Sequence, residues 1–192
     1  MRLTEKGHAL LEQFLQMGDL AIDATAGNGH DTLKMAELVG EEGTVMAIDL
    51  QKAALNATQS RLEAAGCSNR VELILGDHAE ALAKLLPAKA KKAGAITFNL
   101  GYLPGSDKTV TTQEETTITA LEKSLTLLKP GAPLLVTAYR GHPGGLAESE
   151  AVARWAKGLD QQDWEVSLDE PATRPGPFIP PVLWLIRHRI SG

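Results

Sequence analysis

The chain has 192 residues, of which 43% are hydrophobic and 22% are charged, and its net charge is −5. This length and composition predict one soluble domain that spans residues 1–192, and no apolar stretch approaches the length of a membrane span. The negative charge weighs against nucleic-acid binding by bulk electrostatics, and the single cysteine, Cys67, excludes an internal disulfide and a thiolate metal cluster.

Segments with the patterns of strands and helices alternate along most of the chain. Residues 4–17 have apolar positions at helical spacing, and residues 20–25 form a short apolar run typical of a strand buried on both faces. The same patterns predict, in chain order, a helix over 30–39, a strand over 44–50, a helix over 51–66, a strand over 71–77, a helix over 78–87, a strand over 95–100, a helix over 111–131, a strand over 132–139, a helix over 148–160 and strands over 164–171 and 181–189.

This alternation predicts an α/β fold with a mostly parallel, seven-stranded sheet and helices on both faces. Right-handed crossovers return each strand to the same sheet, which makes neighbouring strands parallel. The last two strands follow one another without a helix between them, so we expect an antiparallel pair at the end of the sheet. That ending departs from an all-parallel Rossmann sheet and is typical of Rossmann-like class I methyltransferases. Ligands of such sheets bind at the carboxyl ends of the strands.

The first predicted strand ends in a glycine turn, Asp23-Ala24-Thr25-Ala26-Gly27-Asn28-Gly29, followed by His30, Asp31 and Thr32. In a dinucleotide site the helix N-terminus meets a pyrophosphate, and Asp31 would repel it. S-adenosylmethionine (SAM) has no phosphate but carries an ammonium and a sulfonium, which carboxylates such as Asp23 and Asp31 favour. The alternative is that Asp31 only stabilises the start of the helix through the helix dipole.

Acids also follow the second and third predicted strands. Asp49 lies 22 residues after Gly27, the position at which an acid holds the ribose hydroxyls of NAD or of SAM, and Gln51 is placed to assist. Asp77 and His78 follow the third strand. Asp77 can accept a hydrogen bond from the adenine amine or cap the next helix, and the sequence leaves both interpretations open.

The fourth and fifth predicted strands end in segments that suit a substrate. Asn99 offers a hydrogen-bond donor and an acceptor, and Tyr102 can stack on a base, although a buried structural asparagine would give the same sequence. The loop over residues 139–145 is rich in glycine. We interpret it as a substrate lip in which Arg140 meets a phosphate and His142 makes a polar contact or accepts a proton; the alternative is a surface turn.

Together these motifs resemble one family. DATAGNGHDT, AIDLQ, GDHAE, NLGYLPGSDKTVTT and YRGHPGG, in this order and spacing, are similar to the YtqB-like "putative rRNA methylases", now assigned as MnmM-type tRNA methyltransferases. The resemblance covers residues 18–150. It implies a class I SAM-dependent fold, release of S-adenosylhomocysteine (SAH), and methylation of the amine of 5-aminomethyl-2-thiouridine at the tRNA wobble position, in the anticodon stem-loop. One departure is the segment over 172–179, which lacks the family's usual Asn-Gln before Pro180-Pro181.

The resemblance and the strand ends together give three sets of candidate residues and no metal ligands. The cofactor set is Asp23, Gly27, Asn28, Gly29, His30, Asp31, Thr32, Asp49, Gln51, Asp77, His78, Asn99 and Gly101. The catalytic set is Asn99, Tyr102 and His142, and the substrate set is Leu100, Tyr102, Tyr139, Arg140 and His142. We expect Asn99 and the Leu100 carbonyl to orient the amine, Tyr102 to pack against the base, and solvent or His142 to accept the proton.

Other functions and the partners follow from weaker signals. Rival interpretations are methylation of rRNA or of a small molecule, an NAD-dependent oxidoreductase, and a non-catalytic adenosine-binding module. A tRNA substrate calls for a local basic face, which we predict from Arg140, His142, Arg174 and lysines among Lys89 to Lys92. The N-terminus has no signal-peptide pattern, so we expect a cytoplasmic protein without a membrane partner. The sequence leaves the oligomeric state open, with a homodimer as one outcome.

Overall fold

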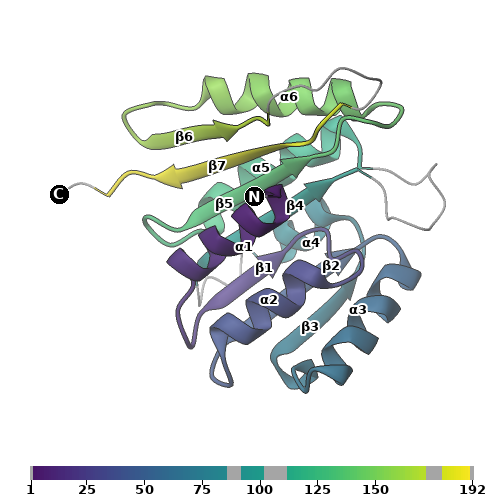
Figure 1. The fold of residues 1–192 in the computed structure, drawn as a ribbon. Helices are drawn as coiled ribbons and strands as arrows, with labels where there is room; N and C mark the ends of the chain where they lie inside the picture. The colour runs from purple at the N-terminus through teal and green to yellow at the C-terminus, as the bar shows by residue number, and fades with distance from the viewer. Residues whose placement is uncertain (1, 86–91, 102–111, 172–178, 191–192) are drawn as a thin grey trace.

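The computed structural model describes residues 2–85, 92–101, 112–171 and 179–190. Within them, seven strands form one sheet of order β3-β2-β1-β4-β5-β7-β6 (Figure 1). The strands are β1 (Leu20–Asp23), β2 (Thr44–Asp49), β3 (Val71–Leu75), β4 (Ala93–Leu100), β5 (Pro133–Ala138), β6 (Trp164–Asp169) and β7 (Val182–His188). The α-helices are α1 (Leu3–Phe14), α2 (His30–Val39), α3 (Lys52–Ala64), α4 (His78–Leu85), α5 (Glu114–Leu127) and α6 (Gly145–Gly158), and a short 3-10 helix covers Ser68–Arg70.

The pairing of the strands confirms the predicted fold class. The strands β3, β2, β1, β4 and β5 are parallel to one another, and β7 is antiparallel to both β5 and β6. The chain moves outward from β1 to β2 and β3, then returns to place β4 on the other side of β1. This reversal of strand order is the topological switch point, at which open α/β sheets bind their ligands.

Alternating side chains on the strands make two apolar layers, one on each face of the sheet. On one face, Ile96 and Leu134 belong to a core shared with α4, α5 and α6. On the other face, Ala95 and Leu135 belong to a core shared with α1 and α2. The helices therefore cover both faces, and the carboxyl ends of the parallel strands stay open at one edge (Figure 1).

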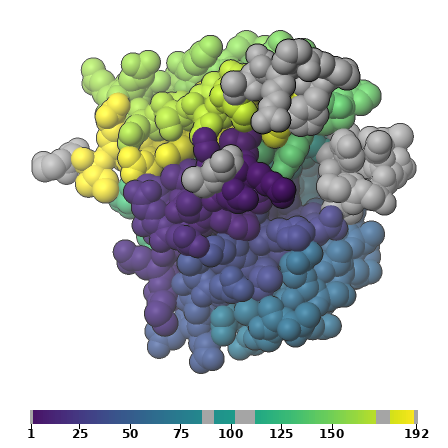
Figure 2. All heavy atoms as spheres, viewed as in Figure 1, coloured from purple at the N-terminus to yellow at the C-terminus, as the bar shows by residue number. Residues whose placement is uncertain are grey.

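The N-terminal helix α1 lies across the face of the sheet that also carries α2. Leu11, which is 1% exposed, belongs to the same core as Met35 of α2. Figure 2 shows α1 in purple between the blue segment of the N-terminal half and the yellow-green C-terminal strands. The helix ends at Phe14, three residues before the predicted end, and its first turn lies beside the open edge of the sheet. None of the described helices is long and apolar enough to cross a bilayer.

Candidate active site

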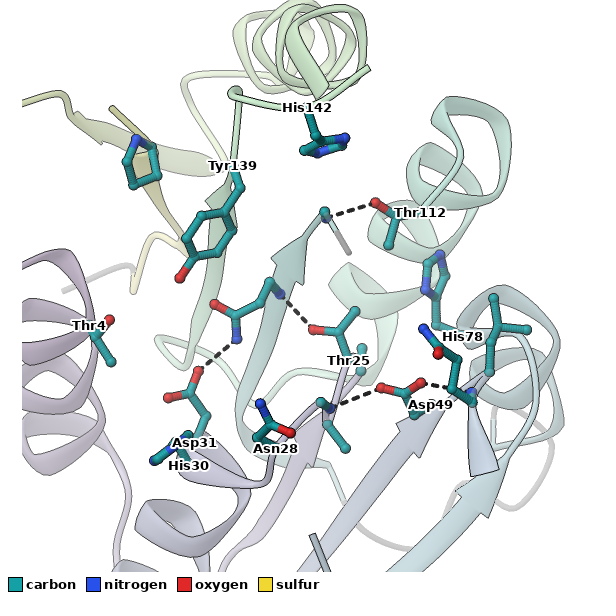
Figure 3. A pocket seen from close by; sticks show the side chains of 18 of the residues that line it. Thr4, Thr25, Asn28, His30, Asp31, Asp49, His78, Thr112, Tyr139 and His142 are labelled. Carbon is teal, nitrogen blue, oxygen red and sulfur yellow. Dashed lines mark hydrogen bonds between the residues drawn. The ribbon is translucent and has the colours of Figure 1, made fainter. Parts of the chain in front are cut away.

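A pocket of about 1050 Å³ opens over the carboxyl ends of β1 to β5 (Figure 3). One side, the glycine-turn half, is formed by Gly27, Asn28, Asp49, Gln51, Gly76 and His78. The other side, the Tyr139 half, is formed by Thr4, Tyr139, Arg140, His142, Ile179 and Pro181. Figure 3 shows Asp49 and His78 on one side of the pocket and Thr4 and Tyr139 on the other. The pocket therefore offers two adjoining subsites.

The turn after β1 requires its glycines. Gly27 and Gly29 have φ angles of 55° and 76°, in the left-handed region that other residues rarely adopt. A Cβ atom on Gly29 would lie 2.8 Å from the Cα atom of Thr58 in α3. Arg61 of α3 holds the turn from outside, because its Nε donates to the Asn28 carbonyl oxygen at 2.7 Å. The backbone of the turn is thereby fixed at the floor of the pocket.

Asp49 connects this turn to the end of β2. Its two carboxylate oxygens accept hydrogen bonds from the backbone N–H groups of Gly27, at 2.9 Å, and Gln51, at 2.8 Å. Each oxygen keeps a further lone pair for a ligand. The structure thus brings together Asp49, Gln51 and the glycine turn, as the ribose-binding prediction requires.

The two candidate residues that follow β3, Asp77 and His78, have different contacts. Asp77 caps α4, because its Oδ1 accepts hydrogen bonds from the backbone N–H groups of Ala79 and Glu80. Asp77 does not line the pocket, whereas His78 does. The His78 side chain is buried, and its Nε2 finds no hydrogen-bond partner within the described part of the chain. The His78 ring packs edge-on against Phe98, with 5.6 Å between the ring centroids.

Asp23 and Thr32 lie beneath the glycine turn rather than in the pocket. Asp23 is fully buried and accepts a hydrogen bond from the Thr32 hydroxyl at 2.6 Å, and neither residue lines the pocket. Burial and then the negative charge of Asp31 raise the pKa of Asp23 from 3.8 to about 7. Asp23 therefore supports the turn from within the core.

The raised pKa of Asp23 predicts a pH dependence of stability. Between about pH 4 and pH 7 the folded chain binds a proton at Asp23 that the unfolded chain releases, so the free energy of unfolding falls as the pH rises. One pKa unit corresponds to about 1.4 kcal/mol. Urea unfolding should show this loss for wild type but not for Asp23→Asn, which has no carboxyl group to ionise at this position. Between pH 5 and pH 8, the free energy of unfolding of wild type should therefore fall by more than about 1 kcal/mol relative to that of the variant. Parallel pH profiles would contradict a protonated Asp23.

Asp31, at the start of α2, joins the two halves of the pocket. Its Oδ1 accepts a hydrogen bond from His8 Nε2 of α1, and its Oδ2 accepts one from Asn99 Nδ2 at the end of β4, both at 2.7 Å. The backbone N–H of Asn99 donates to Thr25 Oγ1 at 2.6 Å. Burial raises the pKa of Asp31, but the hydrogen bonds from His8 and Asn99 outweigh it and leave the pKa below its ordinary value. Asp31 is therefore an anion.

His30 lines the pocket at the same helix start, on the outer rim. Burial and the neighbouring Arg61 lower the pKa of His30, and its Nε2 lies 3.2 Å from Arg61 Nη2. Arginine can only donate, so this ring nitrogen accepts and the imidazole is neutral.

A buried acid that the sequence did not indicate lies beside Gly101 and Thr112. Gly101 and Thr112 bond to each other twice: Gly101 N–H donates to Thr112 Oγ1 at 3.0 Å, and Thr112 N–H donates to the Gly101 carbonyl oxygen at 3.1 Å. Glu148 of α6 is 4% exposed and accepts hydrogen bonds from the hydroxyls of Thr112 and Thr117, both at 2.7 Å. Gly101 and Thr112 line the pocket, while Tyr102 lies outside the described residues.

The candidate substrate residues differ in whether they line the pocket. Leu100 is buried, and its carbonyl oxygen accepts a hydrogen bond from the backbone N–H of Tyr139, so it does not face the pocket. Tyr139 does, and Figure 3 shows its side chain on the same side of the pocket as Thr4 of α1. Burial and the charge of Asp31 raise the pKa of Tyr139. Arg140 lines the pocket, but its Nε donates to the Pro180 carbonyl and its Nη1 pairs with Glu170.

His142 packs between two glycines at the edge of the Tyr139 half. A Cβ atom on Gly101 would lie 3.5 Å from His142 Nε2, and one on Gly145 would lie 2.6 Å from it. His142 Nδ1 lies 3.0 Å from the carbonyl oxygen of Pro143, which can only accept. Nδ1 is therefore the donor of this contact.

A methyl group at Gly145 should disturb this packing. Its Cβ would also lie 2.6 Å from the Tyr139 carbonyl oxygen, so Gly145→Ala should lower the free energy of unfolding by about 1–3 kcal/mol. Gly158, at the other end of α6, is a matched control because nothing lies within 4 Å of its added Cβ. Gly158→Ala should be neutral or slightly stabilising in the same denaturant titration. Equal effects of the two variants would show that His142 is not fixed by this contact.

The structure describes only some of the residues of the predicted basic face. Lys92 precedes β4 and donates to the Thr126 carbonyl, at the end of the sheet opposite the pocket, so this part of the prediction is wrong. Lys89, Lys91 and Arg174 lie outside the described residues. Arg2 of the N-terminal segment lines the pocket, which the sequence did not indicate. Within the described residues no group of three His, Cys, Asp or Glu side chains could hold a metal ion.

The sheet order, the antiparallel β7 and the ligand pocket at the switch point define the fold of a class I methyltransferase. The family model described as "Putative rRNA methylase" matches residues 45–186, and the chain belongs to this family.

Known relatives agree with this placement. The chain is 40% identical over 171 residues to "tRNA (mnm(5)s(2)U34)-methyltransferase, chloroplastic" of Arabidopsis thaliana, a match that covers 85% of this chain but only 62% of that protein. A crystal structure of a "putative rRNA-methylase" from Clostridium thermocellum has a TM-score of 0.90 and 34% identity over 98% of both chains. A "putative methyltransferase" from Streptococcus mutans in complex with SAH has a TM-score of 0.85 and 36% identity over 98% of this chain and 99% of that chain.

Proposed function

We propose that this protein is a SAM-dependent methyltransferase that acts on tRNA and methylates the amine of 5-aminomethyl-2-thiouridine at the wobble position. The observation that carries the proposal is the place of Asn99. Its side chain lies where the glycine-turn half and the Tyr139 half meet, and its amide is oriented by an anionic Asp31. The Arabidopsis relative, named for this wobble nucleoside, supports the choice of substrate.

The glycine-turn half fits SAM by the chemistry of its groups. Asp49 would bind the ribose hydroxyls, with Gln51 beside it, and His78 would line the adenine end of this half. The backbone of Gly27 and Asn28 and the charge of Asp31 would hold the amino-acid part, which carries an ammonium. The negative charge of Asp31 at the start of α2 disfavours the pyrophosphate of NAD at that helix N-terminus. Bound SAM supplies an activated methyl group on its sulfonium.

The Tyr139 half has the chemistry to place the nucleophile. Asn99 Oδ1 accepts an N–H of the substrate amine and aligns its lone pair, and Tyr139 and Pro181 give the base an apolar wall. The amine nitrogen reacts in its neutral form, its lone pair forming the new N–C bond as the methyl–sulfur bond breaks. The proton that the product releases passes to solvent or to His142, which lines the pocket.

The proposal also concerns the part of the tRNA that is bound, the location of the protein in the cell and its oligomeric state. The wobble nucleotide belongs to the anticodon stem-loop, so we infer that this part of the tRNA enters the Tyr139 half. Arg2 lines the pocket beside α1 and is placed to face a phosphate, whereas Arg140 is engaged by Glu170 and the Pro180 carbonyl. The sequence predicts a cytoplasmic protein, and its substrate would then be cytoplasmic tRNA. A homodimer stays a prediction from the sequence.

The test is mass spectrometry of tRNA nucleosides from a strain that lacks the gene. We expect 5-aminomethyl-2-thiouridine to accumulate and its methylated product to disappear, and the wild-type gene to restore the product. Calorimetry should show binding of SAM and SAH but not of NADH. Unchanged tRNA nucleosides in the deletion strain would overturn the choice of substrate.

A second candidate substrate is ribosomal RNA, because the matching family model carries that description. The same deletion strain distinguishes the two candidates, since its rRNA can be digested and compared with wild type. Loss of a methylated nucleoside from rRNA, with tRNA unchanged, would favour this second function.

A further inference from the structure

His8 is a half-buried residue of the pocket wall with no role in the function proposed above. It belongs to α1, far in sequence from the strand ends, yet its Nε2 lies 2.7 Å from Asp31 Oδ1. The side chains of both residues are largely shielded from solvent, at 28% and 18% exposure. Because a carboxylate has no proton to donate, His8 Nε2 carries the hydrogen of this bond.

The same carboxylate fixes the orientation of Asn99. Asn99 Nδ2 donates to Asp31 Oδ2 at 2.7 Å, and a carboxylate can only accept, so the NH₂ group must face Asp31. The Asn99 carbonyl oxygen, Oδ1, is then turned away from Asp31. Within the described part of the chain Oδ1 accepts no hydrogen bond, and Asn99 lines the pocket. This oxygen is available to an N–H donor of the substrate.

The three side chains form a chain of hydrogen bonds that joins three separate elements of the fold. His8 comes from α1, Asp31 from α2 and Asn99 from β4. A small cavity of about 20 Å³ beside them is bounded by Thr97, Thr137 and the same three residues. A space of this size holds one water molecule. If the imidazole were removed, water would solvate Asp31, and the carboxylate would no longer be held in this orientation.

We propose that His8 is a positioning residue for methyl transfer: it holds Asp31, and through it the Asn99 amide, so that Asn99 Oδ1 receives the substrate amine. This inference rests on the proposed function for its kinetic consequences, and on the structure alone for the orientation of Asn99. It goes beyond the motif residues, because nothing in the pattern of the N-terminal helix marks His8.

The kinetic test compares His8→Ala, His8→Gln and a matched control on the same helix. Glu12 also links α1 to α2, through Lys34 at 2.5 Å, but lies outside the pocket. With tRNA carrying the aminomethyl nucleoside, we expect His8→Ala to lower kcat by about 10- to 100-fold, with the SAM dissociation constant changed less than about twofold. His8→Gln keeps a donor and should recover most of the loss, and Glu12→Ala should keep the wild-type kcat.

Equal losses in His8→Ala and Glu12→Ala would overturn the inference, because the effect would then come from the docking of α1. So would a His8→Gln variant as slow as His8→Ala, or a His8→Ala variant with wild-type kcat. Thermal unfolding of all three variants identifies any loss that follows stability alone.

A second measurement does not depend on activity. The side-chain amide signal of Asn99 in a ¹H–¹⁵N spectrum is assigned by its disappearance in Asn99→Ala. We expect this signal to shift in His8→Ala and to return toward its wild-type position in His8→Gln. An unchanged signal in His8→Ala would overturn the inference even if the protein methylates tRNA. If wild type transfers no methyl group, the proposed function fails while this spectrum still decides the role of His8.

Discussion

Replacing Asn99 by alanine should lower kcat for methyl transfer by about 100-fold or more. The change removes the Oδ1 acceptor at the meeting point of the two half-pockets, and a nucleophile held about 1 Å out of place costs about this factor. The SAM dissociation constant should change less than about threefold, since Asp49, Gln51 and His78 are untouched. The measurement is single-turnover kinetics on tRNA that carries the aminomethyl nucleoside, with SAM binding followed by calorimetry.

The matched control is Asn56→Ala, the same chemical change on the exposed face of α3. It should leave both kcat and SAM affinity at wild-type values. If Asn99→Ala turned over like this control, Asn99 would have no part in the reaction, and its side-chain amide would be only a structural partner of Asp31.

The fold could be predicted because the information is local. Each strand is a short apolar run and each helix has its own periodicity, so the alternation of elements fixed the sheet type, and the directly joined last strands fixed the antiparallel pair. Asp49 could be found for a similar reason, because its spacing from Gly27 places it at the neighbouring strand end. Both conclusions depend on neighbours in the sequence or in the sheet.

The parts of the site that escaped prediction depend on packing between distant segments. Asp23 was expected to face the ligand, but alternation along β1 puts it on the same face as Ala21, where Thr32 of α2 covers it. His8 and Glu148 reach the site from helices whose docking no local pattern reveals. Arg140 was expected to meet a phosphate, but its ion pair with Glu170 could not be seen from residues 30 positions apart.

The second large effect is expected when Asp49 is replaced. Comparing this variant with one at Asp77 distinguishes the roles of the two acids at the ends of β2 and β3. Asp49→Asn should raise the SAM dissociation constant by about 10- to 100-fold, because it removes a charged acceptor for the ribose and weakens the bonds to Gly27 and Gln51, each worth about 1.5–3 kcal/mol when charged. Asp77→Asn should instead lower thermal stability through the cap of α4 and change SAM binding less than about threefold. Calorimetry and thermal unfolding measure both.

Asp163→Asn, the same change at an exposed position, is the control for net charge and should alter neither quantity. A tenfold loss of SAM affinity in Asp77→Asn would mean that its carboxylate meets the adenine amine in addition to capping α4. Wild-type affinity in Asp49→Asn would remove the ribose contact, and with it the reason for assigning the cofactor to the glycine-turn half. The two acids therefore decide which end of that half holds the nucleoside of SAM.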